Sequence, residues 1–402
     1  MRHLTVIATA SLWATAALAG PTYGPGTSAT EIKVGQTIPY SGPASGFGLY
    51  GRAWTAYFDM INKKGGINGR KITVLSLDNG YNPSKAVEQT RKLVEEDDVL
   101  AEIGTVGTVP NAAVQKYMNN KKVPQVLISA GGSRFNDPKN FPWTVPFYPT
   151  FDMEASVYAK HILDTRPDAR IGILYQNDDY GRDFLKGFKE TLGAKVSLIV
   201  GEQSYALTDP TVDSQVLALQ SAGATVLMQF TTPKFAAQVI RKAHSIGWSP
   251  SQYLASPASS IQGTLVPAGV AASTGVMTAV FHKQVGDPAW DKDKDVVDFL
   301  AFMKEWAPAQ NAFDAMAISG YLNAQLTAIV LDRCKDDLSR ENLLKQATTL
   351  KDVSLPMLLP GIRVSNTPGD YRLYHELQLA RFDGTGWTPV GGLIRVEPPA
   401  GN

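Results

Sequence analysis

The stretch that decides the fold is residues 31–69, which read EIKVGQTIPYSGPASGFGLYGRAWTAYFDMINKKGGING. Side chains alternate between two faces from Ile32 to Thr37, which predicts a short strand with one face buried. The loop at 39–48 is rich in Gly, Pro and Ser, so its backbone can approach a small ligand closely. Apolar residues then recur at helical spacing between Ala53 and Ile61. A strand that leads through such a loop into a helix is where open α/β sheets bind ligands, so we seek the site here first.

Strands and helices continue to alternate after this unit. We expect strands at 71–78, 99–104 and 124–129, with helices at 82–96 and 111–120 between them. This alternation predicts a parallel, doubly wound sheet. Residues 141–151, FPWTVPFYPTF, then place three prolines among aromatic residues, and we interpret them as a crossing into a second domain.

The second half of the chain repeats the same pattern. Strands and helices alternate again between residues 152 and 255, which predicts a second sheet of the same α/β class. A long helix is expected at 314–334, because apolar residues recur there at helical spacing. The segments 371–382 and 386–390 favour a hairpin around Asp383-Gly384. We expect this tail to return to the second domain.

Composition excludes several classes of partner. The 402 residues are 44% hydrophobic and 19% charged, which is enough for two domains with sizeable cores. The formal net charge of +1 gives no electrostatic reason to expect nucleic acid or an anionic membrane surface as a partner.

The N-terminus and the cysteine count indicate an exported protein. Residues 1–19 combine Arg2, an apolar run from Leu4 to Leu18 and small residues before Gly20, which predicts a cleaved signal peptide. A membrane anchor is the alternative, but the run is short and rich in Ala and Thr. Cys334 is the single cysteine, so the chain has no internal disulfide and no cysteine at the cleavage site to accept a lipid. We therefore predict a free periplasmic protein.

Signals for catalysis are weak. Residues 46–51 form a GxGxxG pattern, but the strand ends too early and Asp78 lies too far on for a dinucleotide site. The histidines are scattered, no serine lies in a GxSxG elbow, and Asp178-Asp179 suits the start of a helix. We expect no enzyme activity, no cofactor and no metal site.

Polar backbone at the ends of strands makes the best candidate site. Thr108 and residues 130–133 each follow a strand, where free N–H groups and hydroxyls can hold a carboxylate. Tyr180 and Thr231 occupy corresponding loops of the second domain, across the expected cleft. The alternative is that these residues only form caps and turns. The candidates here are Thr108, Ala130, Gly131, Gly132, Ser133, Tyr180 and Thr231.

At these residues the sequence resembles the periplasmic substrate-binding proteins of the branched-chain amino acid (leucine, isoleucine, valine) ABC transporter family. The similar segments are IKVGQTIPYSGP, INKKGGINGRKI, 78–96, 103–111 and 171–184. The resemblance implies two α/β lobes with doubly wound parallel sheets, joined by three hinge crossings, which is the type I fold. It implies lobe I at 30–146 and 281–360, and lobe II at 147–280 and 361–398. The expected partners are a small ligand and an ABC permease with its ATPase, and the protein is expected to be a monomer.

The resemblance also assigns roles to residues. It implies that Thr108, Ala130 and Gly132 bind the ligand carboxylate, that Phe47 packs on the ligand side chain, and that Tyr180 closes from the second lobe. The family's first-lobe disulfide would need cysteines near Tyr81 and Gly107, and neither is Cys.

The loop at 255–260 departs from the family's pattern in a way that concerns the ligand. It reads ASPASS, and Pro257 stands near the acid expected to pair with the ligand ammonium. A buried ammonium without an anionic partner is costly, so we favour an aromatic or other organic carboxylate over an α-amino acid. An amino acid remains the alternative if Asp178, Glu202 or another acid substitutes. A ligand-sensing subunit of a membrane receptor is a further alternative.

Overall fold

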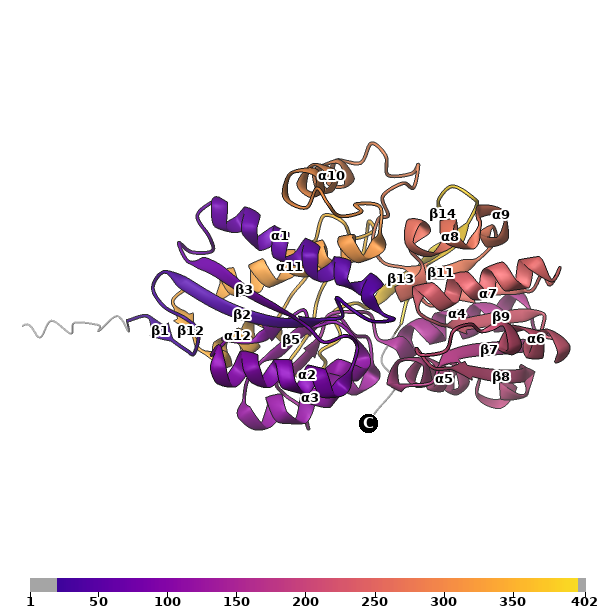
Figure 1. Ribbon diagram of the computed structural model, residues 1–402, viewed down its shortest axis with the longest axis horizontal. Helices are drawn as coiled ribbons and strands as arrows, with labels where there is room; N and C mark the ends of the chain where they lie inside the picture. The colour runs from indigo at the N-terminus through magenta and orange to yellow at the C-terminus, as the bar shows by residue number, and fades with distance from the viewer. Residues whose placement is uncertain (1–19, 397–402) are drawn as a thin grey trace, which may run out of the picture.

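A computed structural model describes residues 20–396, and the predicted signal peptide at 1–19 lies outside the described residues. The chain forms two lobes, each built on its own sheet and lying end to end (Figure 1). We call the part built on the five-stranded sheet lobe I and the part built on the seven-stranded sheet lobe II. The predicted α/β class with two lobes is confirmed.

Lobe I contains a fully parallel sheet in the order β3-β2-β4-β5-β6. Helices α1 and α11 pack together on one face, and α2 and α3 on the other (Figure 1). A two-stranded pair, β1 with β12, lies at the far end. The elements are β1 (Thr22–Tyr23), β2 (Glu31–Ile38), α1 (Gly48–Lys63), β3 (Lys71–Asp78), α2 (Pro83–Arg91), β4 (Glu102–Ile103), α3 (Thr108–Lys121), β5 (Gln125–Ile128), β6 (Thr144–Pro146), α10 (Lys294–Trp306), α11 (Ala315–Cys334), β12 (Asp337–Leu338) and α12 (Arg340–Ala347).

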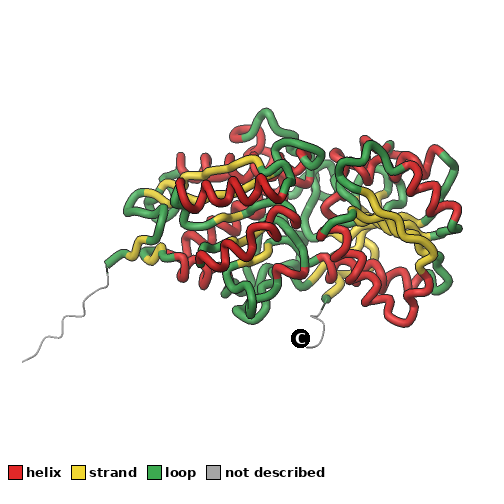
Figure 2. Tube along the Cα trace, turned by 60° about the horizontal axis from the view of Figure 1, so that its bottom comes forward, coloured by secondary structure: helices red, strands yellow, loops and turns green. Residues whose placement is uncertain are grey.

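Lobe II contains a mixed sheet in the order β14-β13-β11-β10-β9-β7-β8. The strands from β8 to β11 are parallel, as predicted, whereas the β13–β14 hairpin pairs antiparallel at one edge. Helices lie on both sides of this sheet (Figure 2). The elements are α4 (Phe151–Thr165), β7 (Ile171–Gln176), α5 (Asp179–Leu192), β8 (Ile199–Tyr205), α6 (Asp213–Ser221), β9 (Val226–Phe230), α7 (Pro233–Ser245), β10 (Ser251–Leu254), α8 (Val266–Ala268), α9 (Val270–Ser273), β11 (Met277–Val280), β13 (Glu376–Phe382) and β14 (Trp387–Arg395).

The chain crosses between the two sheets three times: after β6, after β11 and before β13. The tail therefore returns to the second sheet, as its hairpin signal predicted. Because each lobe is assembled from separate parts of the chain, motion between the lobes bends three connections at once.

A buried hydrogen-bond chain joins the early and late parts of lobe I. The Trp54 indole N–H donates to Asn323 Oδ1 over 2.9 Å, and Asn323 Nδ2 donates to the Leu127 carbonyl over 2.8 Å. Leu127 has a left-handed φ of 52°, which is costly for a leucine, and the pairing register of β5 shifts there. Asn323 thus supports a strained residue two positions before the loop at 129–133.

One sequence prediction needs correction in detail. The strand expected at 99–104 is only Glu102–Ile103. Within residues 20–396, no helix is long and apolar enough to cross a bilayer.

Candidate functional site

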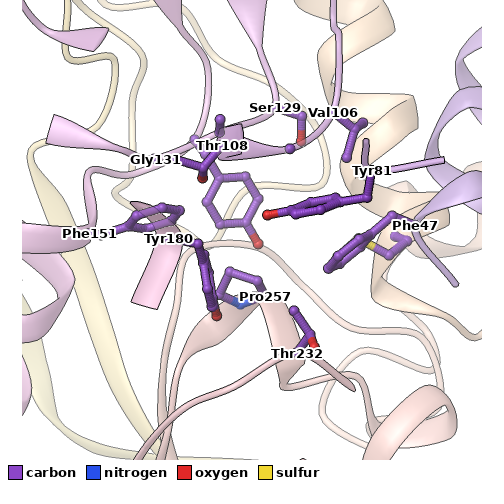
Figure 3. A pocket seen from close by; sticks show the side chains of 14 residues that line it. Phe47, Tyr81, Val106, Thr108, Ser129, Gly131, Phe151, Tyr180, Thr232 and Pro257 are labelled. Carbon is purple, nitrogen blue, oxygen red and sulfur yellow. The ribbon is translucent and has the colours of Figure 1, made fainter. Parts of the chain in front are cut away.

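A pocket with about 430 Å³ of empty space, open solvent included, lies between the lobes (Figure 3). None of the 14 residues that line it is charged, and five of them are aromatic. Lobe I contributes the strand-end loops, and lobe II contributes Tyr180 and Pro257 from the opposite side. The lining consists of Phe47, Tyr81, Val106, Gly107, Thr108, Ser129, Ala130, Gly131, Tyr148, Phe151, Tyr180, Thr232, Pro257 and Met316.

The wall from lobe I presents hydrogen-bond donors. Thr108 is the first residue of α3, so the positive end of this helix dipole faces this side of the cavity. The Thr108 hydroxyl and the Gly131 N–H have no protein partner within residues 20–396, whereas the Ala130 N–H donates to the Ile128 carbonyl. An oxyanion placed here can accept hydrogen bonds that the protein does not use itself.

Gly131 lies where the chain leaves no space for a side chain. A Cβ at this position would come 2.2 Å from the Pro149 carbonyl oxygen and 2.6 Å from the Phe151 ring. The Phe151 N–H also donates to the Gly131 carbonyl over 2.7 Å. The loop of lobe I is therefore packed directly against the crossing that leads into lobe II.

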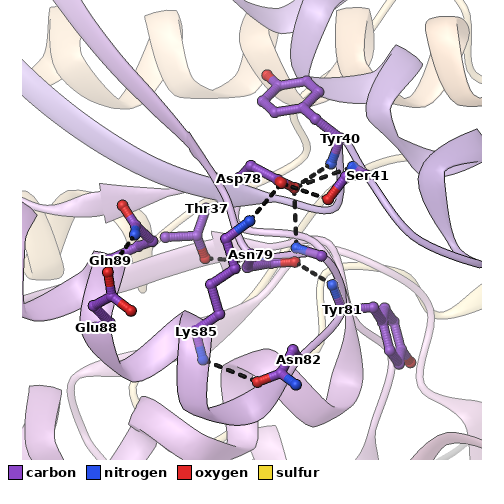
Figure 4. Close-up of polar contacts among 11 residues, drawn as sticks. Thr37, Tyr40, Ser41, Asp78, Asn79, Tyr81, Asn82, Lys85, Glu88 and Gln89 are labelled. Atoms are coloured by element: carbon purple, nitrogen blue, oxygen red, sulfur yellow. Dashed lines mark hydrogen bonds and ion pairs between the residues drawn. The ribbon is translucent and has the colours of Figure 1, made fainter.

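The loop that carries Phe47 is tied down by Asp78 (Figure 4). The Asp78 carboxylate accepts hydrogen bonds from the Tyr40, Ser41 and Gly80 N–H groups and from the Ser41 hydroxyl. It also pairs with the Lys85 ammonium at 2.6 Å. Burial alone would raise the pKa of Asp78, but Lys85 and these donors hold it well below its usual range. Asp78, which superficially suggested a nucleotide site, is an anchor for the ligand-side loop.

The wall from lobe II has already used its polar groups. The Tyr180 hydroxyl donates to the Thr231 carbonyl over 3.0 Å, so the ring rather than the hydroxyl faces the cavity. The Thr232 hydroxyl lies within hydrogen-bond distance of Tyr205 and Gln176. Asp178 caps α5 by accepting from the Tyr180 and Gly181 N–H groups, as its position in the sequence predicted.

A buried acid lies behind this wall. Both Glu154 oxygens accept hydrogen bonds from Ser256, one from its N–H and one from its hydroxyl, each over 2.6 Å. The Tyr158 hydroxyl donates to the same carboxylate over 2.6 Å. Burial raises the pKa of Glu154 to about 7. Glu154 does not line the cavity, but Ser256 directly precedes Pro257, which does.

Comparison with known proteins assigns this architecture. A family model described as periplasmic binding protein matches residues 31–386. The chain belongs to the periplasmic binding protein family. The Leu/Ile/Val-binding protein homolog 7 of Brucella suis is 27% identical over 259 residues, which are 62% of this chain and 62% of that protein. The chain thus matches less than two thirds of the length of this curated relative.

Solved structures share the fold of this periplasmic binding protein at low sequence identity. A branched-chain amino acid ABC transporter protein from Thermus thermophilus with bound valine has a TM-score of 0.82 and 14% identity, covering 91% of this chain and 97% of its own. A solute-binding protein from R. palustris in complex with benzoate has a TM-score of 0.74 and 19% identity, covering 91% and 98%. The family and its fold are those of solute-binding proteins rather than enzymes.

The two lobes of this periplasmic binding protein touch beside the cavity. The Ser133 N–H and hydroxyl donate to the Asp183 carboxylate over 2.8 Å and 2.5 Å, joining a loop of lobe I to α5 of lobe II. Arg134 pairs with Asp179 at 3.1 Å in the same region. The lobes are therefore closed on the cavity in this structure.

The predicted site residues divide into two groups. Six of them line the cavity: Phe47, Thr108, Ala130, Gly131, Tyr180 and Pro257. Gly132, Ser133 and Thr231 are not among the lining residues but are adjacent to them in sequence. Ser133 donates to the Asp183 carboxylate, and the Thr231 carbonyl accepts from the Tyr180 hydroxyl. Tyr148 also lines the cavity, whereas Tyr50, Phe147 and Phe281 pack in the core.

Sequence reasoning missed several lining residues, notably Tyr81, Phe151 and Met316, whereas Thr232, which follows a strand beside Thr231, was expected across the cleft and lines the cavity. Tyr81 was noted only for the absent disulfide, yet a Cβ at Gly107 would come 2.8 Å from its ring. The aromatic ring thus fills space beside the glycine that begins α3. A usable signal was present, because the tyrosine and the glycine replace both cysteines together.

Proposed function

We propose that this protein is the periplasmic solute-binding component of an ABC importer and captures a small organic carboxylate between its lobes. Its signal peptide would be residues 1–19, and its partners the permease and ATPase of the importer. Lobe I would comprise 30–146 and 281–360, and lobe II 147–280 and 361–398. The protein would act as a monomer, without a cofactor.

The absence of charge among the lining residues carries this proposal. An α-amino acid brings an ammonium group, which needs an anionic partner once it leaves water. Two acids considered for that role are occupied elsewhere: Asp178 caps α5, and Glu202 pairs with Lys189 at 2.8 Å. Both oxygens of Glu154 are held by Ser256 and Tyr158.

A carboxylate, in contrast, suits the wall of lobe I. The Thr108 hydroxyl and the Gly131 N–H are donors that the protein does not use itself, and the positive end of the α3 dipole lies beside them. Five aromatic rings surround the remaining space and favour a planar or otherwise apolar body. We propose that Phe47, Thr108, Ala130, Gly131, Tyr180 and Pro257 contact the ligand directly.

A branched-chain or other amino acid is the second candidate ligand. The names of the Brucella proteins and the valine in the Thermus thermophilus structure favour it, whereas the benzoate in the R. palustris structure favours the first. A sensor subunit would have the same cavity, and it would differ in lacking a permease partner.

A thermal-shift screen of ligand-stripped protein tests the proposal. The panel contains benzoate, cinnamate, short aliphatic carboxylates, leucine, isoleucine and valine, and each compound is recovered afterwards to check for turnover. Ligand at 100 times its dissociation constant stabilises the folded state by about 2.7 kcal/mol. We expect carboxylates without an ammonium group to raise Tm. A shift with valine or leucine alone would contradict the carboxylate proposal.

A further inference from the structure

Glu154 lies in a position that the binding role described above does not use. It belongs to the first turn of α4, directly after the crossing from lobe I, and is completely buried. Its carboxylate is held by Ser256, whose neighbour Pro257 is part of the cavity wall. The acid is therefore linked to the cavity through a single residue.

The surroundings of Glu154 contain no positive charge. The titratable groups that face it are the hydroxyls of Tyr148, Tyr158 and Tyr180. No lysine, arginine, histidine or second carboxylate among the described residues contributes to its electrostatic environment. Tyr148 and Tyr180 also line the cavity, so the same two side chains interact with this acid and face a ligand in the cavity.

The hydrogen bonds around Glu154 accommodate either protonation state. The Tyr158 oxygen lies 2.6 Å from Glu154 Oε1 and 2.9 Å from the Leu254 carbonyl, and it accepts from the Ala279 N–H over 2.9 Å. When Glu154 is ionised, Tyr158 donates to its carboxylate. When Glu154 is protonated, its own O–H donates to Tyr158, which turns its hydrogen to the Leu254 carbonyl. Neither state leaves a buried donor unpaired.

We propose that Glu154 takes up a proton from solvent when an anionic ligand enters the cavity, so that ligand affinity falls as the pH rises through neutrality. This inference rests on the proposed carboxylate ligand. A negative charge in the cavity and a second one on the fully buried Glu154 behind its wall repel each other, because burial weakens the screening by water. Because coupling is reciprocal, an anion that favours the protonated acid binds more tightly when the acid is already protonated. Burial has already raised the pKa of Glu154 to about 7, so the charge of this side chain changes near neutral pH and ligand affinity changes over the same pH range.

Benzoate affinity between pH 5.5 and pH 8.5 tests this coupling, because benzoate stays ionised throughout. We expect binding to be about three- to tenfold weaker at pH 8.5, and calorimetry in buffers of different ionisation enthalpy to show proton uptake near pH 7. Glu154→Gln should remove both the pH dependence and the proton uptake. Glu102→Gln is the matched control, since Glu102 is a second buried acid with a pKa raised to about 7, placed in β4 of lobe I. It should keep the pH dependence of binding.

A second variant covers the case in which Glu154→Gln does not fold. Ser256→Ala removes one donor to the carboxylate, so it should raise the pKa of Glu154 and move the midpoint of the affinity change to higher pH. Equal affinity across the pH range, or a pH dependence that persists in Glu154→Gln, would overturn the coupling alone. Failure of benzoate and of every other carboxylate in the thermal-shift panel to bind at any pH would contradict the proposed ligand class as well, and the coupling would fall with it.

Discussion

The two walls of the cavity differ in what they leave unpaired. On the lobe I side, the Thr108 hydroxyl and the Gly131 N–H have no protein acceptor or donor of their own among the described residues. On the lobe II side, Tyr180 and Thr232 already hydrogen-bond within lobe II. The comparison indicates that lobe I supplies polar recognition, whereas lobe II supplies shape and closure. A ligand would then bind first to lobe I and be enclosed by lobe II.

The most severe test of this comparison is Gly131→Ala. The new Cβ would collide with the Pro149 carbonyl and the Phe151 ring, so we expect a loss of roughly 3 kcal/mol in unfolding free energy and loss of ligand binding. Gly46→Ala is the control, because a Cβ there meets nothing within 4 Å. Urea denaturation and calorimetry measure both effects. Near-normal binding by Gly131→Ala would show that ligand binding does not depend on the close packing of Gly131 against Pro149 and Phe151.

Closure is tested at the contact between Ser133 and Asp183. Asp183→Asn weakens two hydrogen bonds to a carboxylate that only form when the lobes meet, so we expect about tenfold weaker binding. Solution scattering should show a more open average shape. Asp179→Asn removes only a half-exposed ion pair with Arg134 and should cost well under 1 kcal/mol. Equal effects of the two substitutions would argue against a specific closing contact.

A pair of conservative substitutions compares the two walls directly. Thr108→Val removes an unpaired hydroxyl facing the ligand, and we expect affinity to fall about five- to tenfold. Tyr180→Phe removes a hydroxyl that serves Thr231, so it should lower the unfolding free energy by about 1 kcal/mol and change affinity less than about twofold. The reverse ranking of affinities would place polar recognition on lobe II.

The smallest expected effect concerns the anchor of the lobe I loop. Asp78→Asn should lower the unfolding free energy by about 1 kcal/mol at pH 7, since five donors converge on the carboxylate. The native pKa of Asp78 lies below its usual value, so its stabilisation is complete above about pH 4 and is lost as the pH falls towards the native pKa.

Urea denaturation at pH 7 and pH 3 measures this effect. Glu88→Gln, on the exposed face of α2, is the control and should leave the unfolding free energy unchanged at both values. A difference between wild type and Asp78→Asn that grows at pH 3 would show that the charge of Asp78 is not what anchors the loop.

The sequence predicted those features of the fold that depend on local pattern. The unit from β2 to α1, the long helix α11 and the β13–β14 hairpin all follow from periodicity and turn residues. The extent of β4 did not, because a buried parallel strand of two residues has no alternation to detect. The return of the tail to lobe II was expected, but its antiparallel pairing with β11 was not, because local signals do not specify which strand it joins.

Site residues were predictable where a polar or small residue directly follows a strand, or where a residue departs from the type expected at its position. Thr108 and Gly131 follow strands, and Pro257 stood out because an acid was expected nearby. Phe151 and Glu154 escaped notice, because both lie in the first turn of a helix that resembles any other partly buried helix. Only the packing of the Phe151 ring against the Gly131 loop makes it part of the cavity wall, and only the Ser256 loop encloses that acid.

The hydrogen bonds from Trp54 to Asn323 and from Asn323 to Leu127 have a consequence for the order of folding. The strained residue that leads into the ligand loop is supported by a side chain 196 residues further along the chain. A nascent chain that has not yet produced α11 cannot shape that loop, and contacts so distant in sequence form slowly. The ability to bind ligand should thus appear late, after nearly the whole polypeptide has been made, and fragments that stop before Asn323 should lack it.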